Sequence, residues 1–326
     1  MKKVNISCPG KLMLFGDHAV VHNRHCLVTA VDQRLTVTIE KSSDEGITLT
    51  APDVGLNNFA FSLADSDSPD FPKVAKFVAQ SISNFSKRHS FSMGLRVSTR
   101  SEFGATFGFG SSSAVTVATL KALDEVFETH LSNEDIFQLG YQTVIDIQGV
   151  GSGFDLASAI WGNTILFATG GKEIVPLGVS SLPIVVGYTG VKADTATLVK
   201  QVNKLKQQYP AFVESVFDQI ESIVLEAKPL IVEQEWAEVG QYMNFQQGLL
   251  ESLGVGSPQL SSLIFAARHA GAFGAKLSGA GGGDCMITVV DDDHRKAVET
   301  AIIQAGGTVL SVNLSAPGLK VQSDND

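Results

Sequence analysis

A glycine- and serine-rich segment, GFGSSSA at residues 108–114, lies between a strand-like stretch and a strongly helical one. Glycines let a backbone approach a ligand closely, and the N–H groups and positive dipole at the start of a helix can hold phosphate oxygens. Serine hydroxyls add donors and oxygen atoms that suit magnesium. Taken alone, the segment is explained equally well as a glycine-serine turn that ends in a helix cap.

A second glycine cluster, KLSGAGGGD at residues 276–284, precedes an apolar strand. A hairpin needs only one or two residues with positive φ, so this cluster favours close approach to a ligand, with a flexible loop as the alternative. Neither cluster is a Walker A loop, and Gly10-Lys11 is followed by Leu12 where that motif needs serine or threonine. Neither matches the GxGxxG pattern, so a Rossmann dinucleotide site is disfavoured.

A carboxylate follows a third glycine-containing turn. The segment GVGSGFDLASAIWG, residues 149–162, puts Asp155 directly after the turn and before a short apolar helix. A side chain in that position can face a cleft. The alternative is that Asp155 only caps the helix expected over residues 156–161.

The opening segment CPGKLMLFGDHAVV, residues 8–21, brackets a strand-like apolar run with Lys11 on one side and Asp17-His18 on the other. A lysine beside a strand often only extends its ammonium to solvent, so Lys11 by itself indicates little. The nearby histidines lack the paired helical spacing and the acid of zinc enzymes, which disfavours a zinc site.

Composition excludes several classes of partner. A net charge of -10 and no basic stripe argue against a nucleic-acid partner. Three cysteines without a CxxC pair fit reduced, buried thiols in the cytoplasm better than a disulfide framework. No apolar run approaches the roughly 20 residues of a membrane span, so no membrane association is expected. Pro9-Gly10 interrupts the start before an export signal could form.

Hydrophobic periodicity predicts an α+β chain. We expect a long surface connection over residues 51–72 and place a domain boundary within residues 168–182, which gives domains 1–175 and 176–326. The predicted strands cover residues 26–40, 93–99, 163–168, 183–188, 285–290 and 307–313. The predicted helices cover residues 73–87, 112–128, 133–147, 194–207, 210–226, 230–253, 258–270 and 294–305.

Together and in this order, the four segments resemble the GHMP kinases, the superfamily of galacto-, homoserine, mevalonate and phosphomevalonate kinases. The opening segment is similar to the first motif of the mevalonate kinases, GFGSSSA to the family's phosphate loop, and KLSGAGGGDCMI to its third motif. Residues 244–284 are similar to mevalonate kinases almost throughout. The resemblance implies a two-domain fold, with an N-terminal mixed α/β domain and a C-terminal, helix-rich α/β sandwich domain.

The resemblance also implies the chemistry: ATP-dependent, magnesium-assisted phosphorylation of a small alcohol, with mevalonate favoured. Asp155 would accept or orient the proton of the substrate hydroxyl, and Lys11 would stabilise the developing charge. Asp17, His18 and Thr195 match substrate-binding positions, and Ser112 matches a magnesium ligand. The residues implied to bind ATP are Ser101, Thr106, Phe107, Gly108, Phe109, Gly110, Ser111, Ser112, Gly279 and Gly281.

Two features depart from the mevalonate kinase pattern. Val144 stands where these enzymes usually carry a glutamate ligand for magnesium, and Gln142, Asp146 or water could substitute for it. The GSGFD form around Asp155 is closer to phosphomevalonate kinases. Those enzymes need additional cations for a second phosphate, and the candidates here are Lys192, Arg24 and Lys276.

Other functions remain as alternatives. A sugar kinase of the same superfamily ranks after phosphomevalonate kinase. A decarboxylase of the superfamily is disfavoured by Lys11 and Asp17-His18. A non-catalytic sensor is disfavoured because Asp155 and GFGSSSA are both present. A homodimer is expected from the family resemblance alone.

Overall fold

The computed structural model describes residues 3–67, 71–91, 93–104 and 107–322 of the chain. Within this part, the first layer is an eight-stranded sheet with the order β12-β1-β2-β5-β3-β4, to which β6 adds on β2 and β7 on β6. Its strands are β1 (Lys3–Phe15), β2 (His25–Ser42), β3 (Ile47–Ala51), β4 (Leu56–Phe61), β5 (Gly94–Ser101), β6 (Thr164–Ala168), β7 (Glu173–Pro176) and β12 (Lys320–Gln322).

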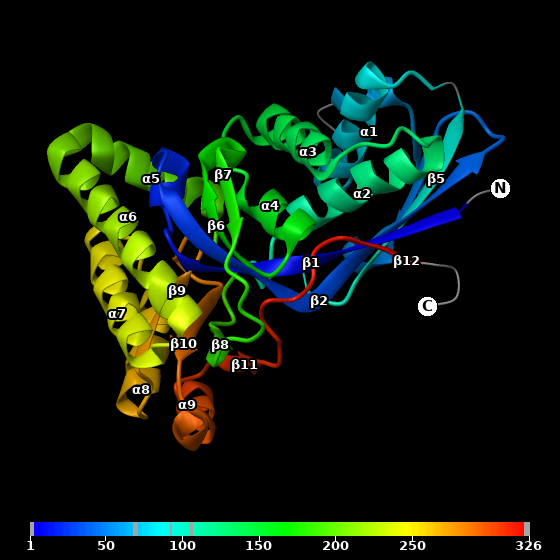
Figure 1. Ribbon diagram of the computed structural model, residues 1–326. Coiled ribbons are helices and arrows are strands. Elements are labelled where there is room, and N and C mark those ends of the chain that lie inside the picture. Colours follow the sequence, from blue (N-terminus) through cyan, green and yellow to red (C-terminus); the bar gives the residue numbers. More distant parts are fainter. Residues whose placement is uncertain (1–2, 68–70, 92, 105–106, 323–326) are drawn as a thin grey trace.

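Four helices cover one face of this sheet (Figure 1). They are α1 (Lys76–Arg88), α2 (Ser111–Phe127), α3 (Asn133–Gln148) and α4 (Phe154–Trp161). Helix α2 lies directly on β1 and β2, and α1 and α3 pack on α2. Ser132 caps α3 in a capping box with Asp135. Because α2 is buried along much of its length, its first turn is held firmly against the middle of β1.

The second layer is a four-stranded antiparallel sheet with the order β11-β8-β10-β9. Helices α7 and α8 pack on β9, and α9 packs on β11. The strands are β8 (Ile184–Tyr188), β9 (Gly274–Ser278), β10 (Cys285–Val289) and β11 (Thr308–Leu310). The helices are α5 (Thr195–Gln208), α6 (Pro210–Glu233), α7 (Trp236–Ser252), α8 (Pro258–His269) and α9 (Asp292–Gln304).

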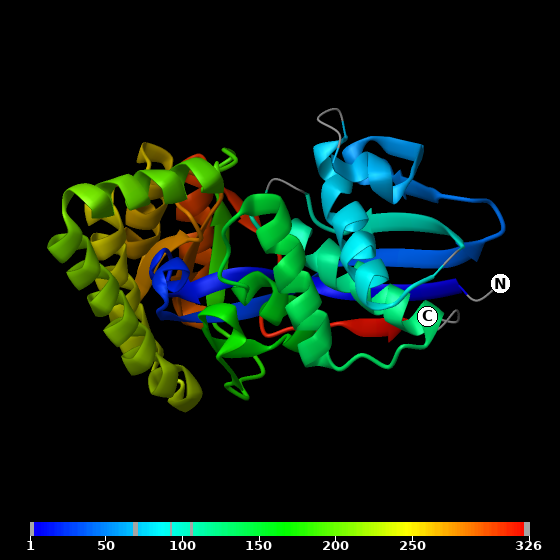
Figure 2. The same cartoon turned by 90° about the horizontal axis from the view of Figure 1, so that it is seen from above.

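Each sheet forms one lobe of the molecule together with the helices that pack on it. The long strands β1 and β2 run from the first lobe toward the second (Figure 2). The end of the chain also crosses back, since β12 pairs with β1 through Asn5 and Gln322. The guanidinium of Arg34 fixes this return by donating to the carbonyls of Pro317 at 2.9 Å and Gly318 at 2.7 Å. The last strand therefore belongs to the first sheet, although its residues follow the second lobe in sequence.

Most predicted elements are present, but the expected surface connection over residues 51–72 contains the strand β4. It pairs with β3, with Ile47 opposite Phe61. Phe59 and Phe61 pack against Phe71, with the rings of Phe61 and Phe71 in an edge contact at 5.3 Å. These aromatic contacts stabilise the β3–β4 hairpin. The many polar residues around β4 in the sequence are typical of a loop, so the strand was not predicted.

Helix α6 continues through Pro229 to Glu233, where a break after residue 226 was expected. A proline inside a helix removes one hydrogen bond and costs about 3 kcal/mol. Ala227 and Ile231 on either side of it are almost fully buried. Burial of this face against the neighbouring elements offsets the cost of the proline. A second missed element, β9, is buried at every position and so shows no alternating pattern.

All three cysteines are free and buried, as their sequence context predicts. Burial raises the pKa of the Cys8 thiol to about 12, so it is an unreactive apolar residue. Among the helices of the described residues, none combines the length and the apolar character of a membrane span.

Candidate active site

The glycine-serine segment forms a tight loop that leads into α2. Gly110 is the residue before the helix and has a left-handed backbone with φ of 78°, and Gly108 has φ of 71°. A Cβ atom at Gly110 would lie 3.3 Å from the Lys11 side chain and 3.5 Å from Oδ1 of Asp155. The Lys11 N–H also donates to the Phe109 carbonyl at 3.0 Å. The loop therefore lies directly against both predicted catalytic side chains.

Lys11 and Asp155 form an ion pair with 3.1 Å between Nζ and Oδ1. Lys11 comes from the middle of β1, and Asp155 from the first turn of α4, 144 positions later in the chain. Gly153, not Asp155, is the cap of α4, so the capping interpretation of Asp155 is wrong. The Lys11 ammonium also lies over the Phe154 ring at 5.1 Å, which restricts its position. With side-chain exposures of 12% and 32%, the pair is shielded yet accessible.

The loop and first turn of α2 contain most of the residues expected to bind ATP: Phe107, Gly108, Phe109, Gly110, Ser111 and Ser112. The N–H groups of a first helical turn have no partner within their own helix, so they can bind an anion. Thr106 lies outside the described residues. Ser101 ends β5, where its hydroxyl donates to the Phe103 carbonyl at 2.7 Å. Asp53 accepts from the Ser101 N–H, also at 2.7 Å.

Two of the third-motif glycines lie against the protein's own backbone and do not border open space. A Cβ atom at Gly281 would lie 2.0 Å from the Val255 carbonyl oxygen, and one at Gly283 would lie 2.5 Å from the Val191 carbonyl oxygen. Gly279 differs, since a Cβ atom there would meet nothing within 4 Å. Intramolecular packing thus explains the glycines at 281 and 283. Only at Gly279 does the expected open approach for a ligand remain.

Asp17 and His18 connect the opening segment to the third motif. The Asp17 carboxylate accepts from Lys276 at 2.7 Å, from the Gln246 amide at 2.6 Å and from the Gly279 N–H at 2.6 Å. The Asp17 and Lys276 side chains are both 0% exposed. Burial lowers the pKa of the Lys276 ammonium, while Asp17 opposes this effect. In this structure Asp17 therefore joins two protein segments and is closed to solvent, where direct substrate contact was expected.

His18 is also buried, and its Nε2 lies 2.9 Å from the Ala280 carbonyl oxygen. Because a carbonyl only accepts, Nε2 carries the proton. Burial lowers the pKa of His18. Thr195 is exposed at the start of α5. The structure therefore brings Lys11, Asp155 and the loop together, and it places Thr195 two residues after Ala193, whose N–H donates to Asp284 beside the loop.

Sequence reasoning missed three residues that the structure brings to this region: Gln246, Lys276 as the partner of Asp17, and Asp284. Asp284 lies beside the loop, with Oδ2 2.7 Å from the place of a Gly108 Cβ atom. Burial raises the pKa of the Asp284 carboxyl, with Lys11 and Lys192 acting in the opposite direction. The position of Asp284 directly after a run of glycines could have marked it as a candidate. No spacing rule pairs Asp17 with Lys276.

Two of the three cations considered for a second substrate phosphate are occupied elsewhere. Lys276 is buried with Asp17. Arg24 binds carboxylates of α6, with 2.6 Å to Asp218 and 3.3 Å to Glu214. The structure therefore gives less support to a site for a phosphorylated substrate than the sequence did.

A magnesium ion fits this site only in the company of a nucleotide. Val144 is buried, and Asp146 accepts from Gln142 at 2.6 Å and from Asn84 of α1 at 2.9 Å, so both polar substitutes are hydrogen-bonded within the helices. No group of three or more potential metal-binding His, Cys, Asp or Glu residues occurs in the described part of the chain. Mg²⁺ is commonly held by one or two carboxylates plus substrate phosphates. Asp155 beside Gly110 is such a carboxylate.

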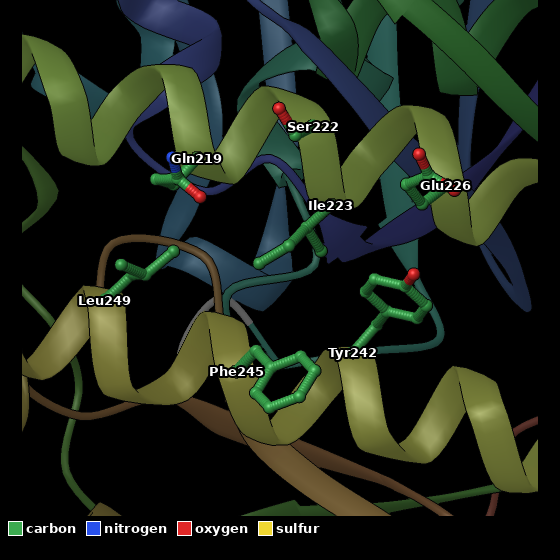
Figure 3. A pocket seen from close by; sticks show the side chains of 7 residues that line it. All are labelled: Gln219, Ser222, Ile223, Glu226, Tyr242, Phe245 and Leu249. Carbon is green, nitrogen blue, oxygen red and sulfur yellow. The ribbon is translucent and has the colours of Figure 1, made fainter.

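A groove of about 360 Å³ lies away from this site, between α6 and α7 (Figure 3). Tyr242, Phe245 and Leu249 line it from α7, and Ile223 faces them from α6. None of the residues discussed above lines this groove. It is a mainly apolar surface feature of the second lobe, and it takes no part in the chemistry of Lys11 and Asp155.

Comparisons with known proteins agree with this geometry. Residues 73–163 match the family of GHMP kinases N terminal domains, and residues 227–308 match the GHMP kinases C terminal family. The mevalonate kinase of Pyrococcus furiosus is 35% identical over 98% of this chain and 98% of its own length. A Lin0012 protein from Listeria innocua has a TM-score of 0.88 at 23% identity, over 99% of this chain and 100% of its own.

A further solved structure is the mevalonate kinase of L. major in complex with R-mevalonate. It has a TM-score of 0.78 at 24% identity, and 97% of each chain is covered. Both family regions lie where the structure places the two lobes, and the likeness to a kinase sequence extends over nearly the whole chain. The two-domain α+β fold is thus confirmed, and the chain belongs to the GHMP kinase family.

Proposed function

We propose that this chain is a mevalonate kinase, which transfers the γ-phosphate of ATP to the primary alcohol of mevalonate and yields 5-phosphomevalonate for isoprenoid synthesis. The observation that carries this proposal is the Lys11–Asp155 ion pair at 3.1 Å, directly against the Gly110 turn. The choice of mevalonate is supported by relatives of that name, which are 34 to 35% identical over nearly the full chain.

Asp155 accepts the proton of the substrate hydroxyl, and Lys11 stabilises the negative charge that develops on the attacking oxygen. Phosphoryl transfer passes through a loose transition state, so positioning and charge neutralisation provide most of the rate enhancement. The Asp155 carboxylate lies 3.1 Å from the Lys11 ammonium, and a carboxylate in this place can accept the proton of a neighbouring hydroxyl. The 32% exposure of Asp155 leaves it room to meet a substrate.

The nucleotide phosphates are proposed to lie on residues 106–112, where α2 begins, with further contacts to the nucleotide proposed for Ser101, Gly279 and Gly281. Ser112 is the proposed magnesium ligand. When it is bound with ATP, Mg²⁺ neutralises phosphate charge during transfer. The half-buried start of α2 at Ser111 and Ser112 supports this arrangement, because the N–H groups of a first helical turn stabilise anions.

Mevalonate is proposed to lie between the catalytic pair and the segment of Asp17 and His18, with Thr195 approaching from α5. Asp17 acts mainly by fixing the N–H of Gly279, to which it is bound at 2.6 Å. Phosphomevalonate is the less favoured substrate, since Lys276 and Arg24 already have carboxylate partners. A homodimer is proposed from the family resemblance. A cytoplasmic location is proposed from the three free thiols.

The test is an ADP-release assay in which mevalonate, phosphomevalonate and galactose are offered separately. We expect turnover with mevalonate alone, and a loss of about 10²- to 10⁴-fold in Asp155→Asn, the usual range for removal of a general base. Asp146→Asn is the matched control, because both Asp146 oxygens accept from side-chain amides, those of Gln142 on α3 and Asn84 on α1. Faster turnover of phosphomevalonate, or full activity of Asp155→Asn, would refute the proposal.

A further inference from the structure

Two carboxylates lie against the glycine-serine loop. Asp155 lies near Gly110, where it forms an ion pair with Lys11 and has a proposed role as the base. Asp284 lies beside Gly108 and has no role in the transfer proposed above. Its Oδ2 would be 2.7 Å from a Cβ atom at Gly108, so it lies against the backbone of the loop itself.

The position of Asp284 is fixed by the backbone around it. Its N–H donates to the Val191 carbonyl at 2.7 Å, and its carbonyl accepts from the Thr189 N–H at 2.9 Å. Oδ1 accepts from the Ala193 N–H at 2.9 Å. These contacts use one carboxylate oxygen and direct the other toward Gly108. The side chain is thus rigidly placed, and a rigid charge acts on a neighbouring ligand more strongly than a mobile one.

The neighbouring residue also binds the loop, since the Cys285 thiol donates to the Phe107 carbonyl at 3.3 Å. The start of β10, directly after Asp284, is therefore hydrogen-bonded to the loop. Lys11 and Lys192 lie close enough to favour the charged form of Asp284, against the effect of burial. Asp284 is only partly buried, so its charge is open to whatever lies on the loop.

We infer that Asp284 makes the nucleotide site selective for metal-complexed ATP over metal-free ATP. This rests on the proposed function, in which the loop holds the nucleotide phosphates. A fixed negative charge beside that loop repels the four negative charges of free ATP more than the two that remain on MgATP. It therefore excludes a nucleotide that cannot support transfer, while the helix start and Lys11 attract both forms.

The test measures the dissociation constants of ATP by calorimetry, once with excess Mg²⁺ and once with EDTA, for the wild type and Asp284→Asn. Asparagine keeps an oxygen for the Ala193 N–H and removes the charge. We expect Asp284→Asn to tighten the binding of metal-free ATP by about tenfold, the size expected for one charge at partial screening. The binding of MgATP should tighten much less, because its net charge is smaller, so the ratio of the dissociation constant of metal-free ATP to that of MgATP should fall by several-fold and by less than tenfold.

Asp291→Asn is the matched control, because Asp291 likewise accepts a backbone N–H, from His294 at 2.8 Å, but caps α9. Its ratio should equal that of the wild type. A second variant guards against misfolding of the first: Asp284 has φ of 53°, which glycine adopts without strain, so Asp284→Gly should fold and show the same fall in ratio.

An unchanged ratio in Asp284→Asn or Asp284→Gly overturns the inference, and the proposed function stands if MgATP still binds. A wild-type protein that binds neither form of ATP overturns both. A fall in the ratio that is confined to the Asp284 variants supports the inference. A purely structural role of Asp284 would weaken the binding of metal-free ATP and of MgATP equally and leave the ratio unchanged.

Discussion

The Asp17 carboxylate and the Lys276 ammonium lie 2.7 Å apart, and both side chains are completely shielded from solvent. Asp17 follows β1 in the first lobe and Lys276 lies in β9 of the second. A buried ion pair contributes little net stability, but removal of one partner leaves an uncompensated charge in the interior. The pair therefore makes the contact between the lobes dependent on both residues.

Asp17→Asn should lower the free energy of unfolding by about 3 to 5 kcal/mol, the usual cost of breaking a buried pair from one side. Urea denaturation measures this change. The control is Asp44→Asn, which breaks an exposed pair with Arg96 and should cause a far smaller loss. The double variant Asp17→Leu with Lys276→Met should recover much of the stability, and equal losses at Asp17 and Asp44 would contradict the argument.

Lys11→Met should reduce kcat by roughly 10²-fold or more, since the ammonium acts on charge that develops in the transition state. The KM for ATP should change much less. Steady-state kinetics with mevalonate measures both. Lys41→Met is the matched control, because the Lys41 ammonium also lies over a phenylalanine ring, that of Phe127 at 4.9 Å, but without an aspartate partner in the site. A loss confined to KM would mean that Lys11 only binds substrate.

Gly110→Ala should abolish most turnover. The left-handed backbone costs alanine about 1 to 2 kcal/mol, and the added methyl group would lie 3.3 Å from the Lys11 side chain, which must shift away from its place beside Asp155. Gly178→Ala tests the first effect alone, because Gly178 has φ of 72° and open space around it. Similar shifts in melting temperature, with activity lost only in Gly110→Ala, are expected. Full activity in Gly110→Ala would show that the turn does not position the pair.

The meeting of Lys11, Asp155 and the glycine-serine loop could be predicted from the order of the motifs, because each motif has its own local pattern. The burial of Asp17 with Lys276 could not, since the two residues are 259 positions apart and a lysine in a strand gives no signal of its partner. Hairpin β3–β4 was missed for a related reason. Its stabilising contacts join Phe59 to Phe71, across residues that read as a loop.

His18 should make the protein less stable at acidic pH. Its Nε2 donates to the Ala280 carbonyl, and among the residues that the structure describes Nδ1 has no hydrogen-bond partner. A second proton would therefore be placed on a buried, unpaired nitrogen, and burial lowers the pKa of His18 below its ordinary value of 6.5. Because the unfolded chain then binds the proton more readily, the stabilisation is complete above pH 6.5 and is lost as the pH falls toward the folded pKa.

His18→Gln isolates this effect, since a glutamine amide can still donate to the Ala280 carbonyl but does not titrate. Any strain from the positive φ of residue 18 shifts its stability by the same amount at every pH. Melting temperatures from pH 5 to 8 should therefore run parallel for the two proteins at the alkaline end. Below about pH 6.5 the wild type should lose up to ~1.4 kcal/mol per pH unit relative to the variant. Curves that stay parallel throughout would show that His18 accepts its proton without cost, and would remove it as an acid-sensitive link between the opening segment and the third motif.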